Sequence, residues 1–328
     1  MAVGVIGLGS HVPDRVIDNS EVCRWTGATD EWILARTGIR ERRYAAPGTT
    51  TSDLALPAAR QALDAVPGAA ERLRALVVAT ATPDVPQPAT AAILQHKLGL
   101  REVPAFDVNA VCSGFLYAVA VAEGLLTGRH GAGGYVLVVG ADMFSTIMDR
   151  RDRRTVSLFG DGAGAVLLGE VPDGYGVRAS HLVSDGELHD LVRVEAGGTR
   201  RRVDADAVAE GADRFRMDGR AVRDYALSSL RKLTERVLDE AGVTLDDVDR
   251  FVFHQANPRL LEAFMVGVGA PLEKLALTAP ELGNTAAASI PVTLHAAHRQ
   301  RPLRRGERIL FGSVGGGMNA AATLLTWY

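Results

Sequence analysis

The two halves of the chain repeat the same apolar segments in the same order. Three pairs of segments show the repeat: GVIGLGS at Gly4 with GVRASHL at Gly176, LVVATAT at Leu76 with FVFHQAN at Phe251, and YVLVVGADM at Tyr135 with RILFGSVGG at Arg308. The offset between the two members is nearly the same in all three pairs, and it also separates Cys112 from Asn284, which starts a similar helix-like segment. A nearly constant offset predicts a duplicated α/β unit, with halves at residues 1–171 and 172–328.

Within each half, short runs rich in Val, Leu and Ile alternate with longer helix-like segments. This alternation is typical of α/β proteins whose sheets are covered on both faces. The short runs predict strands over Val3–Leu8, Leu76–Thr80, Ala105–Val108, Val136–Val139, Ala165–Leu168, Phe251–His254, Ile309–Phe311 and Ala322–Thr326. The longer segments predict helices over Ser52–Val66, Thr90–Leu98, Ser113–Leu126, Ala221–Glu240, Pro258–Val266 and Ala286–Arg299.

Composition excludes several classes of protein. The net charge of −3 gives no reason to expect nucleic acid or an anionic membrane as the main partner. The N-terminus lacks a basic region followed by a long apolar stretch, and the apolar segment Phe115–Ala122 is too short to span a bilayer. Two cysteines cannot form a disulfide framework. We therefore expect a cytoplasmic protein.

Two glycine-rich stretches resemble nucleotide-binding loops but are incomplete. GLGSHV at Gly7 lacks the third glycine of a dinucleotide fingerprint, and GDGAGA at Gly160 lacks the Lys-Ser/Thr pair of a phosphate-binding loop. We interpret both stretches as tight turns packed under a sheet.

Cys112 lies between a predicted strand and a predicted helix. At a helix N-terminus, the macrodipole and free N–H groups favour a thiolate, which predicts a thiol pKa below its usual value of about 8.5. The alternative is a packed side chain, since free cysteine is among the most buried residue types. Cys23 lies in the amphipathic segment NSEVCRWTG, which favours packing.

His254 and Asn284 lie at similar junctions in the second half. His254 follows the apolar run RFVF, and Asn284 occupies the position that matches Cys112 by its offset. A Cys, a His and an Asn at strand-to-helix junctions of two related halves can converge at their interface. This arrangement favours a nucleophilic role for Cys112.

The chain resembles the β-ketoacyl-acyl-carrier-protein synthase III family of the thiolase superfamily, nearly end to end. The motifs that carry the resemblance are TDEWILARTGIRERR (29–43), DVNAVCSGF (107–115), FGDGAGAVLL (159–168), FHQANPRL (253–260), GNTAAASIP (283–291) and GGG (315–317). The resemblance implies a five-layered αβαβα fold and a homodimer. It also implies that coenzyme A enters as a thioester substrate and that no cofactor or metal is required.

The resemblance also implies catalytic roles. Cys112 would attack an acyl-CoA, and the N–H groups of Cys112 and Gly316 would form the oxyanion hole, in which one donor can contribute about 3 kcal/mol. His254 and Asn284 would stabilise the enolate left when a malonyl carrier protein loses carbon dioxide. That enolate would attack the acyl group on Cys112 and give a 3-oxoacyl product.

Further roles concern binding. By resemblance, Trp32 would stack on adenine, while Arg36 and Arg153 would hold the phosphates of coenzyme A. Asn257 would anchor a catalytic water or the surroundings of His254, and Arg259 is a candidate contact for an acyl carrier protein. Independently of the family, one group of arginines offers cations for an anionic ligand or an acidic carrier protein, although the alternative for DRRDRR is a solvated loop: Arg36, Arg40, Arg42, Arg43, Arg150, Arg151, Arg153 and Arg154.

Three positions depart from the family pattern. Gln87 stands where the family usually places an aromatic residue that reaches into the partner's acyl pocket. Met318 lies in VGGGMNAA, where GGGFTWG is usual, and Arg223 replaces a common apolar residue. Less aromatic bulk predicts larger or more polar acyl groups, unless neighbours compensate.

These departures leave other functions open. The segment TPDVPQPAT resembles natural-product relatives that load starter units, or that transfer acyl groups to a carrier, hydroxyl or amine without decarboxylation. A third possibility is a non-catalytic thiolase-fold partner with an unreactive Cys112. Retention of both His254 and Asn284 favours decarboxylative condensation, because simple transfer does not require an enolate-stabilising pair.

Overall fold

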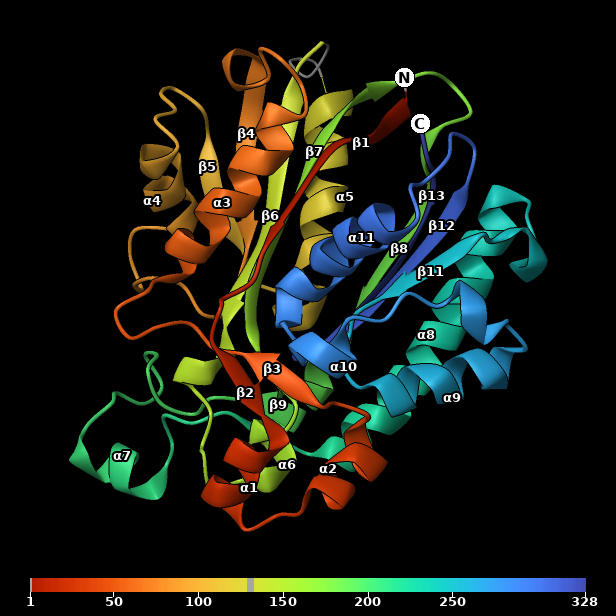
Figure 1. Cartoon of the computed structure of the whole chain (residues 1–328). Helices are drawn as coiled ribbons and strands as arrows, with labels where there is room; N and C mark the ends of the chain where they lie inside the picture. Colours follow the sequence, from red (N-terminus) through yellow and green to blue (C-terminus); the bar gives the residue numbers. More distant parts are fainter. Residues whose placement is uncertain (1, 129–132) are drawn as a thin grey trace.

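Two β-sheets lie side by side in the computed structural model, which describes residues 2–128 and 133–328 (Figure 1). The first sheet has the order β1 (Ala2–His11), β7 (Asp161–Val171), β6 (Tyr135–Met143), β4 (Leu73–Ala79) and β5 (Ala105–Val108). The second has the order β8 (Gly176–Ser184), β13 (Asn319–Thr326), β12 (Arg308–Gly315) and β11 (Arg250–Phe253). The predicted strands are thus present, and β8 is an addition.

Helices form three layers around the two sheets (Figure 1). One outer layer holds α3 (Thr51–Asp64) and α4 (Thr90–Lys97), and the other holds α8 (Gly219–Ala241) and α9 (Pro258–Val268). The central layer holds α5 (Gly114–Thr127) and α11 (Ser289–Gln300), whose apolar residues share one core with both sheets. These layers confirm the predicted αβαβα fold.

The two sheets share one pattern of strand pairing. In the first, β1 and β7 run antiparallel, β7 and β6 run antiparallel, and β6 and β4 run parallel. The second repeats this pattern with β8, β13, β12 and β11. The repeated pairing supports the proposal of two halves that divide at residues 171 and 172, between β7 and β8.

The repeat corrects the expected counterpart of Cys112. A short 3-10 turn, Val111–Ser113, leads directly into α5, and the turn Ala286–Ala288 leads in the same way into α11. Cys112 is central in the first turn and Ala287 is central in the second. The prediction that Asn284 matches Cys112 is therefore wrong by three positions, and the second half has no nucleophile at its turn.

The counterpart of Asn284 is Asn109. The Asn109 Oδ1 atom accepts a hydrogen bond from the N–H of Val111 at 3.2 Å, and the Asn284 Oδ1 atom accepts one from the N–H of Ala286 at 2.8 Å. The φ angles of Val111 and Ala286 are +48° and +49°, in the left-handed region that such residues rarely adopt. Both halves therefore build the same strained turn.

A group of short elements caps the site end of the two sheets (Figure 1). Most are too short to give a periodic signal, and the sequence patterns do not predict them. They are β2 (Val16–Asp18), α1 (Asn19–Thr26), α2 (Asp30–Thr37), β3 (Glu41–Arg43), α6 (Arg153–Val156), β9 (Val192–Arg193), α7 (Ala205–Glu210), β10 (Arg216–Met217) and α10 (Ala279–Leu282). Many of their apolar side chains pack together with Cys112 in one cluster, called here the cap cluster.

The glycine-rich stretches are not tight turns as expected. Gly7 lies inside β1, and Gly160 immediately precedes β7. A Cβ atom at Gly7 would collide with the Ala62 carbonyl oxygen, and one at Gly160 would collide with the Leu282 carbonyl oxygen. These glycines allow neighbouring backbone to pack closely against the first sheet.

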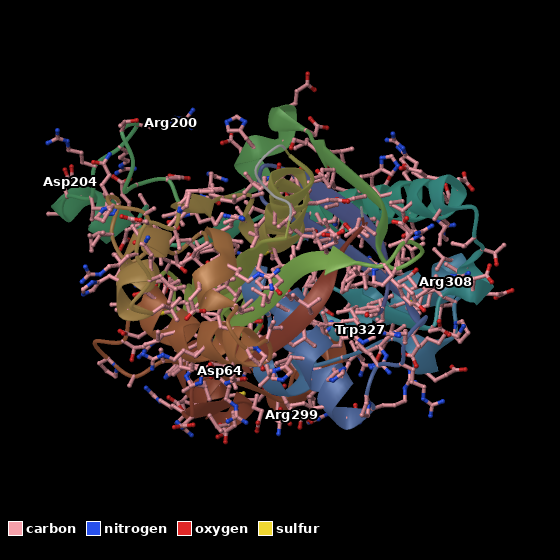
Figure 2. The ribbon with its side chains drawn as sticks, turned by 90° about the horizontal axis from the view of Figure 1, so that it is seen from above. Asp64, Arg200, Asp204, Arg299, Arg308 and Trp327 are labelled. Carbon is pink, nitrogen blue, oxygen red and sulfur yellow. The ribbon has the colours of Figure 1, made fainter. Side chains whose placement is uncertain are left out.

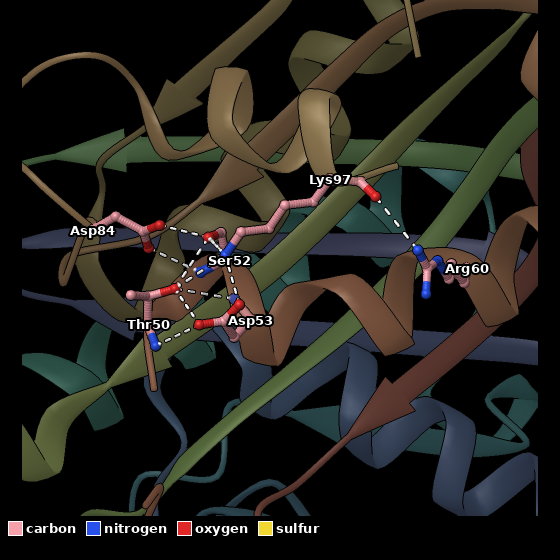
Figure 3. Close-up of polar contacts among 6 residues, drawn as sticks. All are labelled: Thr50, Ser52, Asp53, Arg60, Asp84 and Lys97. Atoms are coloured by element: carbon pink, nitrogen blue, oxygen red, sulfur yellow. Dashed lines mark hydrogen bonds and ion pairs between the residues drawn. The ribbon is translucent and has the colours of Figure 1, made fainter. Parts of the chain in front are cut away.

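A polar cluster anchors the loop that carries Gln87 (Figure 3). The Lys97 Nζ atom lies 2.6 Å from Asp53 Oδ1 and donates to Ser52 Oγ at 2.7 Å. Asp84 Oδ1 in turn accepts from the Ser52 backbone N–H at 2.9 Å. Gln87 is exposed and lies three residues after Asp84, so these hydrogen bonds hold the start of the loop that carries it.

The polar segment between β9 and α8 covers part of the site. Its ends, at β9 and β10, line the main cavity. Its middle projects away from the sheets, where Arg200 and Asp204 lie at one edge of the molecule and Arg308 lies at the opposite edge (Figure 2). None of the helices in residues 2–128 and 133–328 is both long and apolar enough to cross a bilayer.

Candidate active site

One large cavity collects the predicted catalytic residues from both halves of the chain. Its volume is about 1030 Å³, and its lining includes Cys112, His254, Asn284 and Gly316. Cys112, His254 and Asn284 are 8%, 5% and 4% exposed. The convergence expected from the sequence therefore occurs in a site that excludes most water.

Cys112 lies just before α5, as predicted, but the predicted direction of its pKa shift is wrong. Burial raises the pKa of the Cys112 thiol, and the nearby Asp142 carboxylate raises it further. The backbone N–H of Cys112 has the opposite effect but is weaker. The helix N-terminus therefore does not by itself produce a thiolate, and the nucleophile requires a proton acceptor.

His254 can provide that acceptor because it is neutral. It follows β11, its backbone N–H donates to the Gly312 carbonyl at 2.8 Å, and its Nδ1 atom lies 2.7 Å from Ser289 Oγ. Burial lowers the pKa of His254 to about 4, against a weaker opposing contact with the Ala286 backbone. A neutral imidazole can take a proton or donate a hydrogen bond, depending on its tautomer.

The lowered pKa of His254 predicts a loss of stability in acid. The folded state binds a proton on His254 less readily than the unfolded state does. The contribution of neutral His254 to the free energy of unfolding is therefore fully present above the unfolded pKa of about 6.5. It is lost as the pH falls through the folded pKa of about 4. We expect the unfolding free energy to fall by up to about 3 kcal/mol over this range. Urea unfolding at several pH values checks this, since the His254→Gln variant should lack that part of the pH dependence.

Asn284 is held by backbone on both sides. Its N–H donates to the Leu158 carbonyl at 2.7 Å, and its own carbonyl accepts from the Gly160 N–H at 3.0 Å. Its Oδ1 atom accepts from Ala286, so the side-chain orientation is fixed. Within the described residues, the Asn284 Nδ2 group donates no hydrogen bond, and it is available to a ligand in the cavity.

The glycine loop lies directly against the backbone of Cys112. A Cβ atom at Gly315 would lie 2.9 Å from the Cys112 nitrogen, so only glycine leaves that N–H group uncovered. Gly316 is buried beside it and lines the cavity, and its carbonyl accepts from Asn319 Nδ2 at 2.5 Å. An oxyanion hole made by Cys112 and Gly316 remains a prediction that this packing supports.

Trp32 lies between two arginine side chains at the edge of the cavity. The guanidinium carbons of Arg36 and Arg153 lie 5.0 and 4.7 Å from the Trp32 ring centroid. Trp32 and Arg36 line the cavity, and Arg153 is exposed on α6 beside them. This arrangement brings together the three residues predicted to hold coenzyme A.

Arg42 does not serve the ligand, contrary to the prediction. Its side chain is fully buried, and it donates to the Ile17 and Ser157 carbonyls and to Asn19 Oδ1. It holds β3 against neighbouring loops, so it is structural. Several of the other predicted arginines form ion pairs with nearby carboxylates: Arg40 with Glu281, Arg43 with Glu41, Arg151 with Asp149 and Arg154 with Asp152.

Three cavity arginines escaped the sequence prediction. Arg193, Arg216 and Arg220 line the cavity from β9, β10 and the start of α8, together with Asp218. Their grouping depends on how the segment between β9 and α8 folds, so no short sequence pattern reveals it. Four more arginines make the cavity mouth strongly cationic: Arg36, Arg154, Arg223 and Arg259.

Asn257 lines the cavity and also joins two helices, and the role predicted for it stays a prediction. Its Oδ1 atom caps α9 by accepting from the N–H groups of Arg259 and Leu260, and its Nδ2 atom donates to the Arg36 carbonyl at 3.0 Å. Both ends of its amide are therefore used to join α9 to α2. Arg259 is exposed, lines the cavity mouth and pairs with Glu262 at 3.0 Å.

The residues predicted for the acyl pocket lie in different places. Met318 is fully buried and lines the cavity, whereas Arg223 is exposed on α8 and also lines it. Gln87 is exposed on its loop and does not line the cavity of its own chain. Cys23 packs against the cap cluster, and burial raises its pKa, in line with the packing role expected for it.

A buried cysteine, a neutral histidine and an asparagine at the junction of two matching α/β halves define an acyl-transferring enzyme of the thiolase superfamily. The 3-oxoacyl-[acyl-carrier-protein] synthase III family model matches residues 106–186, and the model of its C-terminal part matches residues 238–327. Similarity to known proteins of this family extends along nearly the whole chain. The chain belongs to the 3-oxoacyl-[acyl-carrier-protein] synthase III family.

Curated relatives and solved structures agree with this assignment. An acetoacetyl-CoA synthase from Streptomyces sp. is 47% identical over 98% of both chains, and a β-ketoacyl-[acyl-carrier-protein] synthase III of Streptomyces coelicolor is 46% identical over 98% of this chain and 96% of its own. A Pseudomonas aeruginosa synthase III structure is 37% identical, with a TM-score of 0.89 over 100% and 98% of the two chains. A priming β-ketosynthase of a polyketide pathway is 31% identical, with a TM-score of 0.90 over 99% and 96%.

Proposed function

We propose that the protein condenses an acyl group from acyl-CoA with a malonyl group on an acyl carrier protein. The observation that carries this proposal is the presence of Cys112, a neutral His254 and the free Nδ2 group of Asn284 in one cavity. Simple acyl transfer needs Cys112 and a proton acceptor such as His254, but it does not need the Asn284 amide as a second donor to an enolate.

In the first half-reaction, the Cys112 sulfur attacks the thioester carbonyl of acyl-CoA. Neutral His254 accepts the thiol proton, and the N–H groups of Cys112 and Gly316 stabilise the tetrahedral oxyanion. The carbon–sulfur bond to coenzyme A breaks, and its thiolate takes up the proton. The product is an acyl group on Cys112 and free coenzyme A.

In the second half-reaction, the malonyl thioester loses carbon dioxide. His254 and the Asn284 amide donate hydrogen bonds to the thioester oxygen, which carries the developing enolate charge. The enolate carbon attacks the acyl carbonyl, a carbon–carbon bond forms, and the Cys112 thiolate leaves and takes up a proton from solvent. Two neutral donors suit this step because they stabilise the charge without protonating the carbon.

The cationic cavity mouth matches the phosphates of coenzyme A and of a phosphopantetheine arm. If Arg153 and Trp32 hold coenzyme A, Arg153→Ala should raise the KM for acyl-CoA on the order of tenfold and leave kcat nearly unchanged. Steady-state kinetics checks this. Arg151→Ala is the matched control, because its charge is already paired with Asp149, whereas the Arg153 guanidinium lies over the Trp32 ring.

Carbon dioxide release tests the proposed function. We expect the protein to release labelled carbon dioxide from malonyl carrier protein when acyl-CoA is also supplied, in equal amount to the 3-oxoacyl product. Acylation of Cys112 with transfer to a hydroxyl, amine or carrier but no carbon dioxide would instead show a starter-loading acyltransferase. Failure of Cys112 to take an acyl group from any acyl-CoA or acyl-carrier donor would show a non-catalytic member.

A second candidate concerns the carrier of the malonyl group. Because the chain is 47% identical to an acetoacetyl-CoA synthase, malonyl-CoA is an alternative extender that would give a 3-oxoacyl-CoA. Parallel assays with malonyl-CoA and malonyl carrier protein separate the two candidates by their relative kcat/KM values.

The proposed working form is a homodimer. In the part of the chain that the structure describes, β5 pairs with β4 alone, so its other edge is open to a second copy. The anchored loop near β5 presents Gln87 at the surface, in keeping with a residue that reaches a partner's acyl pocket. Light scattering at assay concentrations should give twice the mass of 34.8 kDa.

A further inference from the structure

The second half contains a copy of the turn that carries the nucleophile. In the first half, no described residue accepts a hydrogen bond from the Cys112 N–H, which is left to the substrate oxyanion. In the second half, Ala287 holds the equivalent position, and its N–H donates to the Asp142 Oδ2 atom at 2.9 Å. A carboxylate oxygen of the protein therefore occupies the second copy of the oxyanion site.

The residues that face the two turns also correspond. Asp142 is the seventh residue after Tyr135 in β6, and Gly315 is the seventh after Arg308 in β12, which are the equivalent strands. Each faces the turn of the other half. Gly315 leaves the Cys112 N–H uncovered, whereas Asp142 covers the N–H of Ala287.

The Asp142 carboxylate is completely buried and fully used. Its Oδ1 atom accepts from the N–H groups of Ala81 and Thr82 at 2.8 and 3.1 Å, and from the hydroxyls of Thr80 and Thr82 at 3.1 and 2.9 Å. Burial nevertheless raises the pKa of Asp142 to about 6, because these hydrogen bonds offset the desolvation only in part. A buried charge with five donors is expensive to keep for packing alone.

We propose that Asp142 is a positioning residue for the decarboxylation and condensation step, which fixes the turn that carries Asn284 by occupying the second oxyanion site. Asn284 is two residues before Ala286, whose N–H bonds to the Asn284 side chain, and Ala286 is adjacent to Ala287. If the N–H of Ala287 loses its acceptor, the turn can rotate and the Asn284 Nδ2 group no longer points at the enolate oxygen. The inference rests on the proposed function.

The test separates the two half-reactions in the Asp142→Asn variant. We expect condensation of malonyl carrier protein to lose kcat by roughly 10- to 100-fold, with the KM for that substrate changed less than about threefold. Acylation of Cys112 by acyl-CoA, measured by rapid quench and intact-protein mass spectrometry, should not fall below the wild-type rate, because loss of the Asp142 charge removes one cause of the raised pKa of the Cys112 thiol. If the substitution only reduced the fraction of folded protein, the rates of both half-reactions would fall by the same factor.

Asp107→Asn is the matched control. The Asp107 carboxylate also accepts two backbone N–H groups, at 2.7 and 2.8 Å, but it faces α4 and not the Asn284 turn. Its variant should keep the ratio of the two rates. If Asp142→Asn does not fold, Thr80→Val, which removes one donor to Asp142, should lower condensation alone by a few fold.

The outcomes are distinct. An equal fall in both half-reactions, or no fall in either, overturns the role of Asp142 while the wild-type activity upholds the proposed function. If the wild-type protein takes an acyl group but releases no carbon dioxide, the proposed function fails, and the role of Asp142 fails with it.

Discussion

Replacement of Cys112 by alanine is expected to abolish acylation, with a loss of overall activity on the order of 10⁴-fold or more. The reason is that Cys112 is the only cysteine that lines the cavity within the described residues, and the other cavity groups cannot form the thioester. Intact-protein mass spectrometry after incubation with acyl-CoA should show one acyl group on the wild type and none on Cys112→Ala. Peptide mapping should place that group on Cys112.

Cys23→Ala provides the matched control. Cys23 packs in the cap cluster and does not line the cavity, so its variant should acylate at the wild-type rate. An acyl group on Cys23 in the wild type, or full acylation of Cys112→Ala, would contradict the assignment of the nucleophile. Iodoacetamide should block activity in proportion to alkylation at Cys112.

Loss of either enolate donor is expected to have the second largest effect. His254→Ala and Asn284→Ala should each lower carbon dioxide release by roughly 100- to 1000-fold, because each removes one donor to the developing charge. Asn284→Ala should leave acylation of Cys112 within about threefold, whereas His254→Ala should also slow acylation, because His254 accepts the thiol proton. Labelled malonyl carrier protein and rapid-quench acylation assays measure the two rates.

Asn109→Ala serves as a control for disturbance of a turn. Asn109 makes the bond in the first half that Asn284 makes in the second, but it does not line the cavity, so its effect should be a loss of stability of about 1 kcal/mol without a specific loss of carbon dioxide release. Equal loss of acylation and carbon dioxide release in Asn284→Ala would argue against its role as an enolate donor.

The fold was predictable from the sequence because its strands are buried and apolar. The first sheet, the two core helices and the pattern of repetition all follow from runs such as Val136–Val139 and from the nearly constant offset between the two halves. The positions of Cys112 and His254 were predictable because each follows an apolar strand, β5 and β11, whereas Asn284 follows the short helix α10 and not a strand. Motif resemblance then supplied the family, which the relatives show.

The remaining features depend on three-dimensional detail that no short pattern carries. The pKa of Cys112 follows from burial and from Asp142, which lies on β6, beyond the whole of α5 in the chain. The burial of Arg42 follows from contacts with three other segments. Asn284 was matched with Cys112 in error because the offset between the two halves differs from element to element. The offset between the two turns is three positions longer than the offset between β1 and β8.

Asn284 belongs to the second half but is held by hydrogen bonds to Leu158 and Gly160 of the first half, so the order in which the ribosome makes the two halves matters for the site. When the nascent chain has reached the end of β7, it already carries Cys112, but Asn284, His254 and the glycine loop have not yet been made. The last of these, at residues 315–317, emerges only with the final strand pair β12 and β13. A chain released early therefore presents Cys112 without His254, Asn284 or the glycine loop, and we expect such a truncated protein to take up no acyl group from acyl-CoA.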